Sequence, residues 1–157
     1  KMKPIPAEIA EALRDPKTIK ILTTTDENGT PHSVVKQSIT VLEDGRLGYL
    51  ELIYRSSTYK NVLRNHRDKK KVAICLYNPE SGFSYQIKGI PSRYVVEGPM
   101  WKEFTNKCWN EMPDAEPAAL WLITPEEVMD ESYDVRLDEE SKRMVNYRFW
   151  NVYARRR

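Results

Sequence analysis

Cysteine and histidine, the residues that most often form disulfides or bind zinc, are scarce in this sequence. Each occurs twice in 157 residues. Cys75 and Cys108 lack Cys-x-x-Cys spacing, and His32 and His66 are too few for the common zinc sites. Cys75 stands in an apolar stretch, which predicts a thiol buried in the core. The sequence therefore predicts neither a disulfide framework nor a metal centre.

Long apolar runs and a large net charge are also absent. No run approaches the ~20 apolar residues that a membrane-spanning helix needs. Charges at Glu8, Glu11 and Arg14 argue against a secretory signal at the start. The formal net charge of +2 is too small to argue for nucleic-acid binding. The basic clusters at 69–71 and 155–157 are interpreted as solvated surface, with phosphate or nucleic-acid contact as the alternative. We expect a cytoplasmic protein without membrane or nucleic-acid partners.

The common phosphate-binding loops and the nucleophile motif of hydrolases are missing. The sequence contains no G-x-G-x-x-G or G-x-x-x-x-G-K-[ST] phosphate loop and no G-x-S-x-G nucleophile elbow. Strands and helices do not alternate regularly, which disfavours a doubly wound parallel sheet. Any cofactor site must therefore be built from other polar segments.

Short apolar segments between turn signals predict a mainly β protein with a few short helices. Helices are expected at 5–13, 57–65 and 101–108. Strands are expected at 19–25, 32–42, 47–53, 71–77, 83–89 with extended chain to Val96, and 118–123. The turn at Asn28-Gly29 and a second polar turn at 43–46 make the first three strands a three-stranded antiparallel meander.

Glycine and proline positions refine this prediction. Pro91 is expected at an edge or a bulge, and Gly89 at a bulge or a close backbone approach. Residues 124–128 are interpreted as a turn. About six strands in hairpin order favour a closed or partly closed antiparallel barrel, because closure removes exposed sheet edges.

The polar segment 54–61 is the most informative part of the sequence. It places three hydroxyls and two cations after a predicted strand and before a predicted helix. The free N–H groups and partial positive charge of a helix start attract phosphate, and hydroxyls with a nearby Lys or Arg would complete an anion site. Simple helix capping by Ser or Thr explains the same residues.

Two predicted strands carry further polar residues. Lys36 and Gln37 interrupt an otherwise apolar strand, and alternation places Gln86 and Lys88 on the face opposite Tyr85. These positions suit either ordinary half-exposed strands or the lining of a flat heterocycle. The four tryptophans, Trp101, Trp109, Trp121 and Trp150, are interpreted as core or interface aromatics.

These segments occur in an order that resembles the pyridoxamine 5′-phosphate oxidase-like family of FMN-binding split barrels. The matching stretches are 21–32, 61–65, 85–89 and 97–99, within residues 5–128. The resemblance implies a six-stranded antiparallel split β-barrel of Greek-key type forming one domain over 1–157. It also implies a homodimer with two FMN sites at the subunit interface. The extension at 132–157 lies outside the match, and its Phe149, Trp150, Val152 and Tyr153 suggest that it packs on something.

The resemblance also implies which residues contact the cofactor. The flavin ring is expected along Val34, Val35, Lys36 and Gln37, and the phosphate at Ser56, Ser57, Thr58, Lys60 and Asn61. Nearby contacts are expected from Glu51, Leu52, Gln86 and Lys88, with Trp121 reaching the partner's flavin. Many relatives carry Lys or Arg where this chain has Ser57 and Thr58, so Lys60 or Arg55 would have to supply the cation.

The resemblance predicts an FMN-dependent oxidoreductase with NAD(P)H or a redox protein as electron donor. Pyridoxamine phosphate oxidation itself is not expected, because the arginine- and histidine-rich substrate elements are missing. Lys36 or Lys88 near the ring would favour the anionic reduced flavin, and the sequence offers no general acid or base. The alternative is a binding or electron-carrier module without turnover that holds FMN, haem or a deazaflavin such as F420.

Overall fold

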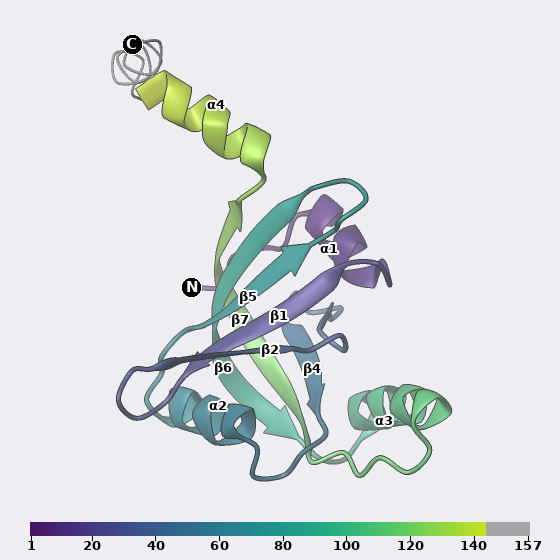
Figure 1. Cartoon of the computed structure of the whole chain (residues 1–157). Coiled ribbons are helices and arrows are strands. Elements are labelled where there is room, and N and C mark those ends of the chain that lie inside the picture. Colours follow the sequence, from purple (N-terminus) through teal and green to yellow (C-terminus); the bar gives the residue numbers. More distant parts are fainter. Residues whose placement is uncertain (144–157) are drawn as a thin grey trace.

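The computed structural model describes residues 1–143, in which seven antiparallel strands form one strongly curled sheet with four helices around it (Figure 1). The sheet order is β2-β1-β5-β6-β7-β4-β3. The strands are β1 (Ile19–Thr25), β2 (Pro31–Val35), β3 (Thr40–Val41), β4 (Leu47–Glu51), β5 (Val72–Tyr77), β6 (Ser84–Val95) and β7 (Ala119–Asp130). The helices are α1 (Ala7–Arg14), α2 (Ser57–Arg67), α3 (Pro99–Glu111) and α4 (Tyr133–Arg143).

The mainly β fold and the three expected helices are confirmed, but the count of six strands is wrong. The extra strand arises because the expected strand 32–42 is divided into β2 and the two-residue β3. β3 pairs with β4, and β4 pairs with β7 rather than with β2. The predicted meander is therefore divided into two hairpins, β1–β2 and β3–β4, which lie at opposite edges of the sheet. The sheet curls into a half-barrel, and full closure is not confirmed.

Side chains end β2 by taking over backbone hydrogen bonds. The Lys36 N–H still donates to the Lys20 carbonyl, but the Ile39 N–H then folds back onto the Lys36 carbonyl. The Gln37 amide replaces the next ladder partner, accepting from the Lys20 N–H at 2.9 Å and donating to the Thr18 carbonyl at 3.0 Å. A side chain that satisfies the neighbouring strand in this way removes the need for the backbone to continue alongside it.

The residues expected to form a turn at 124–128 instead lie inside β7, so that prediction is wrong. Pro125 is accommodated because it stands opposite Gly89 at a register shift, where Lys88 pairs with Glu127 and Gly89 with Pro125. A Cβ on Gly89 would lie 2.4 Å from the Thr124 carbonyl oxygen. The expected close approach at Gly89 is confirmed, and a second register shift at Pro91 confirms the expected bulge there. Bulges increase local bending and twist, which suits the curl of β6 and β7.

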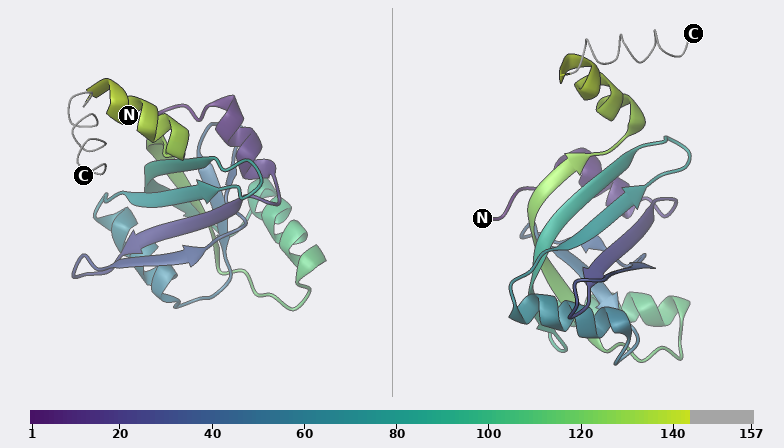
Figure 2. Two further views of the ribbon diagram at one scale, coloured as in Figure 1. Left: turned by 45° about the horizontal axis from the view of Figure 1, so that its top comes forward. Right: turned by 60° about the vertical axis from the view of Figure 1, so that its left-hand side comes forward.

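The main core fills the inner side of the curled sheet. Ile9 and Leu13 of α1 and Val62 of α2 pack into the same cluster as the inner residues of the strands. Figures 1 and 2 show α2 and α3 towards one end of the sheet and α1 nearer the other. The largest buried side chains of this cluster are Trp121 and Tyr49. Burial of each large apolar side chain contributes ~1.5–3 kcal/mol to folding.

A second cluster lies between α3 and the other face of β4 and β7. Leu50, Leu120 and Leu122 alternate with inner-core residues along their strands, so they face α3. Trp101 and Phe104 of α3 pack against them. The apolar residues whose spacing predicted this helix therefore form the face of α3 that packs against the sheet.

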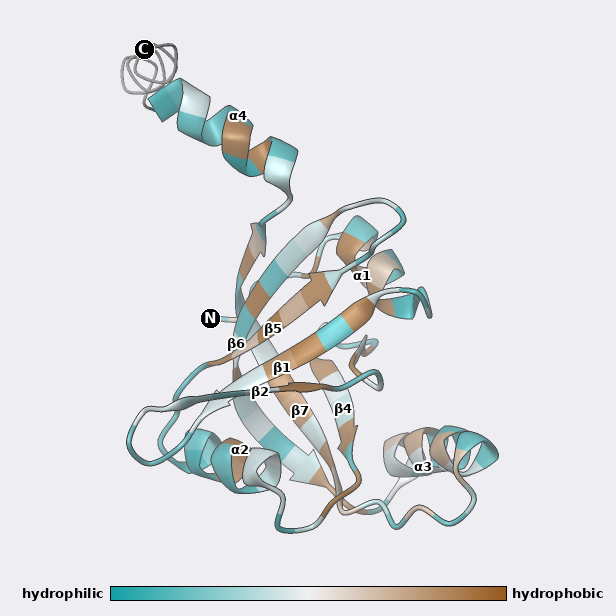
Figure 3. Cartoon of the chain, in the orientation of Figure 1, coloured by the Kyte–Doolittle hydropathy of each residue, from teal (hydrophilic) through white to brown (hydrophobic). Residues whose placement is uncertain are grey.

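Cys75 does not lie in the core, contrary to expectation. In β5 the residues Val72, Ile74 and Leu76 point inward, so Cys75 is half-buried on the outer face of the sheet. The run of apolar residues along β5, visible in Figure 3, hides the alternation of the strand. An apolar strand read from sequence does not reveal which of its faces is inside.

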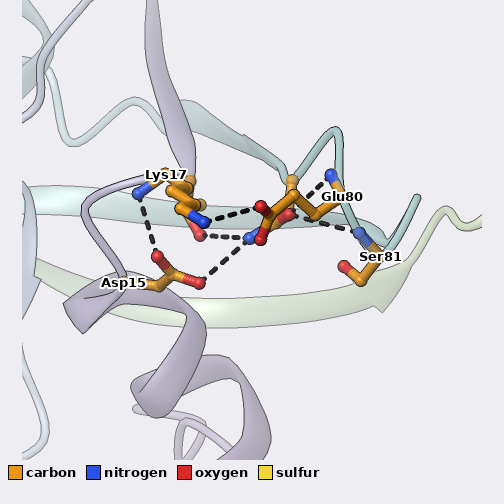
Figure 4. Close-up of polar contacts among 6 residues, drawn as sticks. Asp15, Lys17, Glu80 and Ser81 are labelled. Atoms are coloured by element: carbon orange, nitrogen blue, oxygen red, sulfur yellow. Dashed lines mark hydrogen bonds and ion pairs between the residues drawn. The ribbon is translucent and has the colours of Figure 1, made fainter.

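The link from α1 to β1 is fixed to the β5–β6 loop by a polar network (Figure 4). Buried Asn78 donates to the Asp15 carboxylate at 3.2 Å and accepts from the Glu80 and Ser81 N–H groups at 2.9 and 3.3 Å. Lys17 adds an exposed ion pair with Glu80. One buried amide thus orders both the loop and the entry to β1.

Helix α4 follows β7 and extends away from the sheet (Figure 1), and none of its side chains is fully buried. Residues 144–157 are outside the described part of the chain, and the predicted packing of Phe149, Trp150, Val152 and Tyr153 lies there too. No helix within residues 1–143 is long and apolar enough to span a bilayer.

Substituting Gly89 by alanine should destabilise the fold by about 1–3 kcal/mol or more, because the new methyl group meets backbone rather than a movable side chain. Urea unfolding followed by circular dichroism would measure the change. Arg93→Ala, on an exposed part of the same strand, is the control and should stay within about 0.5 kcal/mol of wild type. Equal stability of Gly89→Ala and wild type would contradict the close approach described above.

Candidate functional site

The start of α2 is a capped helix terminus, as the capping interpretation of residues 54–61 predicted. The Ser56 hydroxyl accepts a hydrogen bond from the Tyr59 N–H at 3.0 Å. Capping satisfies one of the free N–H groups of the first turn, and the others remain available to an anion. Ser56 is therefore committed to the fold, whereas Ser57, one residue later, is exposed.

An open groove of about 350 Å³ lies between α2 and the turn that joins β1 to β2. From α2 it is lined by Ser57, Lys60, Asn61 and Arg64, which recur at helical spacing and so share one face. The other wall is formed by Asp26, Glu27, Thr30, Pro31 and His32. Three of the residues predicted to hold a phosphate, Ser57, Lys60 and Asn61, are thus brought together.

Two asparagines dock α2 onto β1 and so fix one wall of the groove. The Asn61 side-chain amide donates to the Thr24 hydroxyl, and the Asn65 amide to the Thr25 hydroxyl, both at 3.1 Å. Asn61 and Asn65 are buried and one helical turn apart, while Thr24 and Thr25 are consecutive in β1. The helix can therefore neither slide nor rotate without breaking buried hydrogen bonds, which cost ~1–3 kcal/mol each to leave unmade.

Arg64 is the most firmly held cation of the groove. Its guanidinium donates to the side-chain amide oxygen of Asn61 at 3.2 Å and to the Glu27 carboxylate at 3.0 Å. Asp26 is engaged differently: its carboxylate accepts from the Asn28 and Thr30 N–H groups and builds the turn. The groove combines a fixed guanidinium, the Lys60 ammonium, a hydroxyl and a helix start, which is the chemistry of an anion site.

A buried ion pair lies on the other side of the α2 start. The Lys36 ammonium is 3.0 Å from a Glu51 carboxylate oxygen, and their side chains are 17% and 0% exposed. The Tyr49 hydroxyl and Ser56 hydroxyl donate to the same carboxylate over longer distances of 3.4 and 3.5 Å. Burial, and then the neighbouring Glu51, raise the pKa of Tyr49 well above its ordinary value, so Tyr49 remains a protonated donor.

Lys20 holds the turn that carries Lys36. Its buried ammonium donates to the carbonyls of Gln37 and Ile39 at 3.1 and 2.8 Å. Burial, with a smaller contribution from Lys107, lowers the pKa of Lys20 to about 8. Lys20, which has no acidic partner among residues 1–143, thus ties residues 36–39 to β1.

The candidate residues fall into separate places in one subunit. Ser57, Lys60 and Asn61 line the groove, and Lys36, Glu51 and Ser56 form the ion-pair cluster beside it. Val35, Gln86 and Lys88 lie on the outer face of the sheet, with Val35 and Gln86 in one cross-strand row. The remaining candidates have structural contacts: Gln37 bonds the β1 backbone, Val34 pairs with Leu22, Leu52 packs towards α3, and Thr58 and Trp121 are buried.

Trp121 is the centre of an aromatic cluster. Its ring contacts Tyr59, His66 and Tyr94, with centroids 6.2, 5.6 and 5.1 Å away. The indole is fully buried, and its N–H has no hydrogen-bond partner among residues 1–143. In this subunit Trp121 is a core aromatic that supports the start of α2 through Tyr59.

Sequence reasoning missed the other six residues of the groove, which are Asp26, Glu27, Thr30, Pro31, His32 and Arg64. Arg64 could have been found, because it stands seven positions after Ser57 and therefore on the same helical face. Glu27 and His32 belong to the groove only because the hairpin packs beside α2, which no local pattern reveals. Within residues 1–143 no cluster of three metal-binding side chains occurs.

The profile of the pyridoxamine 5′-phosphate oxidase family matches residues 5–131, close to the extent over which the sequence resemblance was recognised. No curated protein matches the chain.

Several solved structures share the fold. HupZ of Group A Streptococcus has a TM-score of 0.65 at 21% identity, over 82% of this chain and 95% of that one. An FMN-binding protein of Syntrophomonas wolfei has a TM-score of 0.63 at 14% identity, over 80% and 87%. HutZ, the haem storage protein of Vibrio cholerae, has a TM-score of 0.59 at 15% identity, over 82% and 95%. At these identities the likeness establishes the fold.

The buried ion pair predicts unequal costs for removing its two members. Lys36→Met leaves the fully buried Glu51 carboxylate without a cation and should cost about 3–5 kcal/mol, whereas Glu51→Gln leaves an ammonium that can still reach water and should cost less. The double variant should be more stable than Lys36→Met alone. Urea unfolding of the four proteins at neutral pH measures this coupling, and strictly additive losses would contradict it.

The lowered pKa of Lys20 predicts a stability that rises in mild alkali. Between pH 8 and its ordinary pKa of 10.5, Lys20 carries fewer protons in the folded chain than in the unfolded chain, so the free energy of unfolding increases with pH. Lys20→Met lacks this contribution. The difference in unfolding free energy between wild type and Lys20→Met should therefore shift in favour of wild type from pH 7.5 to 10, and a constant difference would refute the buried, charged Lys20.

Proposed function

Because the chain belongs to the pyridoxamine 5′-phosphate oxidase family, we propose that it is a flavoprotein that binds FMN between two copies of itself and acts as an oxidoreductase. The observation that carries this proposal is the groove beside α2, where Ser57, Lys60 and Asn61 meet. These are predicted phosphate contacts, and their helical spacing places them together on the face of α2 that lines the groove.

The residues of the groove fit a phosphate monoester. Ser57 is exposed at the first helical position, where the helix dipole favours negative charge. Lys60 is exposed on the next turn, and no ion pair within residues 1–143 engages it. Lys60 thus supplies the cation that the chain lacks at Ser57 and Thr58. Charge-assisted hydrogen bonds of this kind are roughly twice as strong as neutral ones.

The flavin ring would extend from the groove along β2, beside Val35 and the Lys36–Glu51 pair. Since Glu51 compensates the charge of Lys36, this part of the site offers the ring a fixed dipole rather than a lone cation. FMN, when bound, supplies the hydride- or electron-transfer chemistry, with NAD(P)H or a redox protein as donor. The protein's own contribution is to bind, orient and polarise, and no side chain is assigned as acid or base.

A second copy would complete the site through the outer face of the sheet. Val35, Ile21, Cys75, Gln86 and Met129 stand opposite one another across five adjacent strands. Val35 and Met129 are 60% and 42% exposed, so this row, which is apolar apart from the Gln86 amide, is open to solvent in a single subunit. Exposed apolar side chains that gather on one face mark interaction sites. Because Val35 and Gln86 belong to this row, a dimer through it would bring the predicted ring contacts to the interface.

A binding module without turnover is the second candidate. The fold is shared with a haem storage protein, and the groove contains His32, a residue type that ligates haem iron. Haem, FMN and a deazaflavin differ in their absorption spectra. A chromophore that NADH and NADPH fail to bleach would favour a carrier over an oxidoreductase.

The test is an absorption spectrum of the purified protein, release and identification of any chromophore, and titration of the apoprotein with FMN and riboflavin. FMN should bind at least tenfold more tightly than riboflavin, because only FMN presents a phosphate to the groove. Lys60→Gln should weaken FMN binding roughly tenfold and leave riboflavin binding unchanged. Lys102→Gln, which removes an exposed charge on α3, is the matched control.

The dimer is tested in the same experiment with Val35→Glu. This variant should lower the mass measured by light scattering to that of one subunit and weaken the binding of both flavins, since it places a charge in the apolar row. Equal affinity of wild type for FMN and riboflavin would refute the phosphate site. Flavin binding that survives in a monomeric Val35→Glu protein would refute a site between two copies.

A further inference from the structure

The Glu27 carboxylate lies where an anion entering the groove would bind. It is 3.0 Å from the Arg64 guanidinium, and both residues line the groove. We propose that Glu27 is an internal competitor: it occupies Arg64 in the absence of ligand and is displaced when a phosphate monoester enters. This inference rests on the proposed function for the identity of the ligand, and it adds a phosphate contact, Arg64, and a control element, Glu27.

Arg64 is pre-positioned for this exchange. Asn61 accepts from one guanidinium nitrogen at 3.2 Å and is itself bound to Thr24, so a chain of hydrogen bonds connects the guanidinium to β1. The Arg64 side chain is 23% exposed, which leaves its end accessible from the groove. Because Glu27 and Asn61 contact different nitrogens, the guanidinium keeps its Asn61 contact when Glu27 leaves.

Glu27, in contrast, is weakly held. Its side chain is 70% exposed and stands in the turn between β1 and β2, where Arg64 is its recorded partner within residues 1–143. Ion pairs at this exposure shift an equilibrium only a few-fold, because water solvates the separated charges well. A phosphate carries more negative charge than the Glu27 carboxylate and can accept two parallel hydrogen bonds from the Arg64 guanidinium. Phosphate should therefore displace Glu27.

The arrangement selects for ligands that carry a phosphate. A ligand without an anionic group cannot displace Glu27 and meets a groove whose strongest cation is already neutralised. A phosphate monoester gains Arg64 and Lys60 together and returns the Glu27 carboxylate to water. Glu27 therefore lowers the affinity for every anion by a modest factor, and its removal should reveal that factor.

Titration of the apoprotein with inorganic phosphate, followed by amide chemical shifts of residues 26–32 and 57–64, tests the competition directly. Glu27→Gln should raise the affinity for phosphate about 3- to 10-fold, and Arg64→Gln should lower it about tenfold or more. The key result is the double variant: with Arg64 absent, Glu27→Gln should have no further effect. Arg67→Gln and Asp68→Asn, a charged pair at the C-terminal end of the same helix and outside the groove, control for general electrostatic effects and should change the affinity less than twofold.

Titration of the same variants with FMN and with riboflavin distinguishes this inference from the proposed function. Glu27→Gln should strengthen FMN binding by the same factor as phosphate binding and leave riboflavin binding unchanged. FMN binding that is indifferent to Glu27 and Arg64 would overturn the inference while the flavoprotein assignment stood. If phosphate binding follows the predicted pattern but the protein has no affinity for FMN, the competition between Glu27 and phosphate would be supported and the assignment as a flavoprotein would be refuted. Additive effects of the two substitutions on phosphate affinity would overturn the competition itself.

Discussion

The candidate site depends on the docking of α2 against β1 by two buried amides. Asn61 and Asn65 each bind a threonine of the strand, and this pairing fixes both the axial position and the rotation of the helix. The groove, the position of Arg64 and the placement of Ser57 all follow from it. Hydrophobic packing at Val62 alone would hold the helix to the sheet but would tolerate rotation, since apolar contacts are not directional.

An ion pair with a glutamate lies on each side of α2, and the two pairs differ in how easily they separate. Lys36 and Arg64 are each paired with a glutamate, at 3.0 Å in both cases. Glu51 is wholly buried, so separating it from Lys36 would strand a charge away from water, and this pair is permanent. Glu27 is mostly exposed, so separating it from Arg64 costs little. Burial, rather than distance, decides which of the pairs can respond to a ligand.

Local patterns predicted much of the fold, and tertiary contacts account for the errors. The periodicity of α1, α2 and α3 and the bulge residues Gly89 and Pro91 carried enough information for correct predictions. The break after Val35 was missed because it depends on a glutamine side chain replacing a backbone partner on another strand. The strand through Pro125 was missed because the proline is tolerated only opposite Gly89. Of the site, Ser57, Lys60 and Asn61 were foreseen, whereas Glu27 joins them only through the hairpin.

The position of β7 constrains how the chain folds during synthesis. β7 lies between β6 and β4, so β4 has only the two-residue β3 as a neighbour until residues 119–130 are available. While the nascent chain is on the ribosome, β1, β2, β5 and β6 can assemble as hairpins, but β4 waits for a strand that emerges late. Such long-range pairing slows folding and leaves sheet edges open to other chains. In a growing chain, the edges of β4 and β6 that β7 covers therefore stay unpaired until β7 has left the exit tunnel.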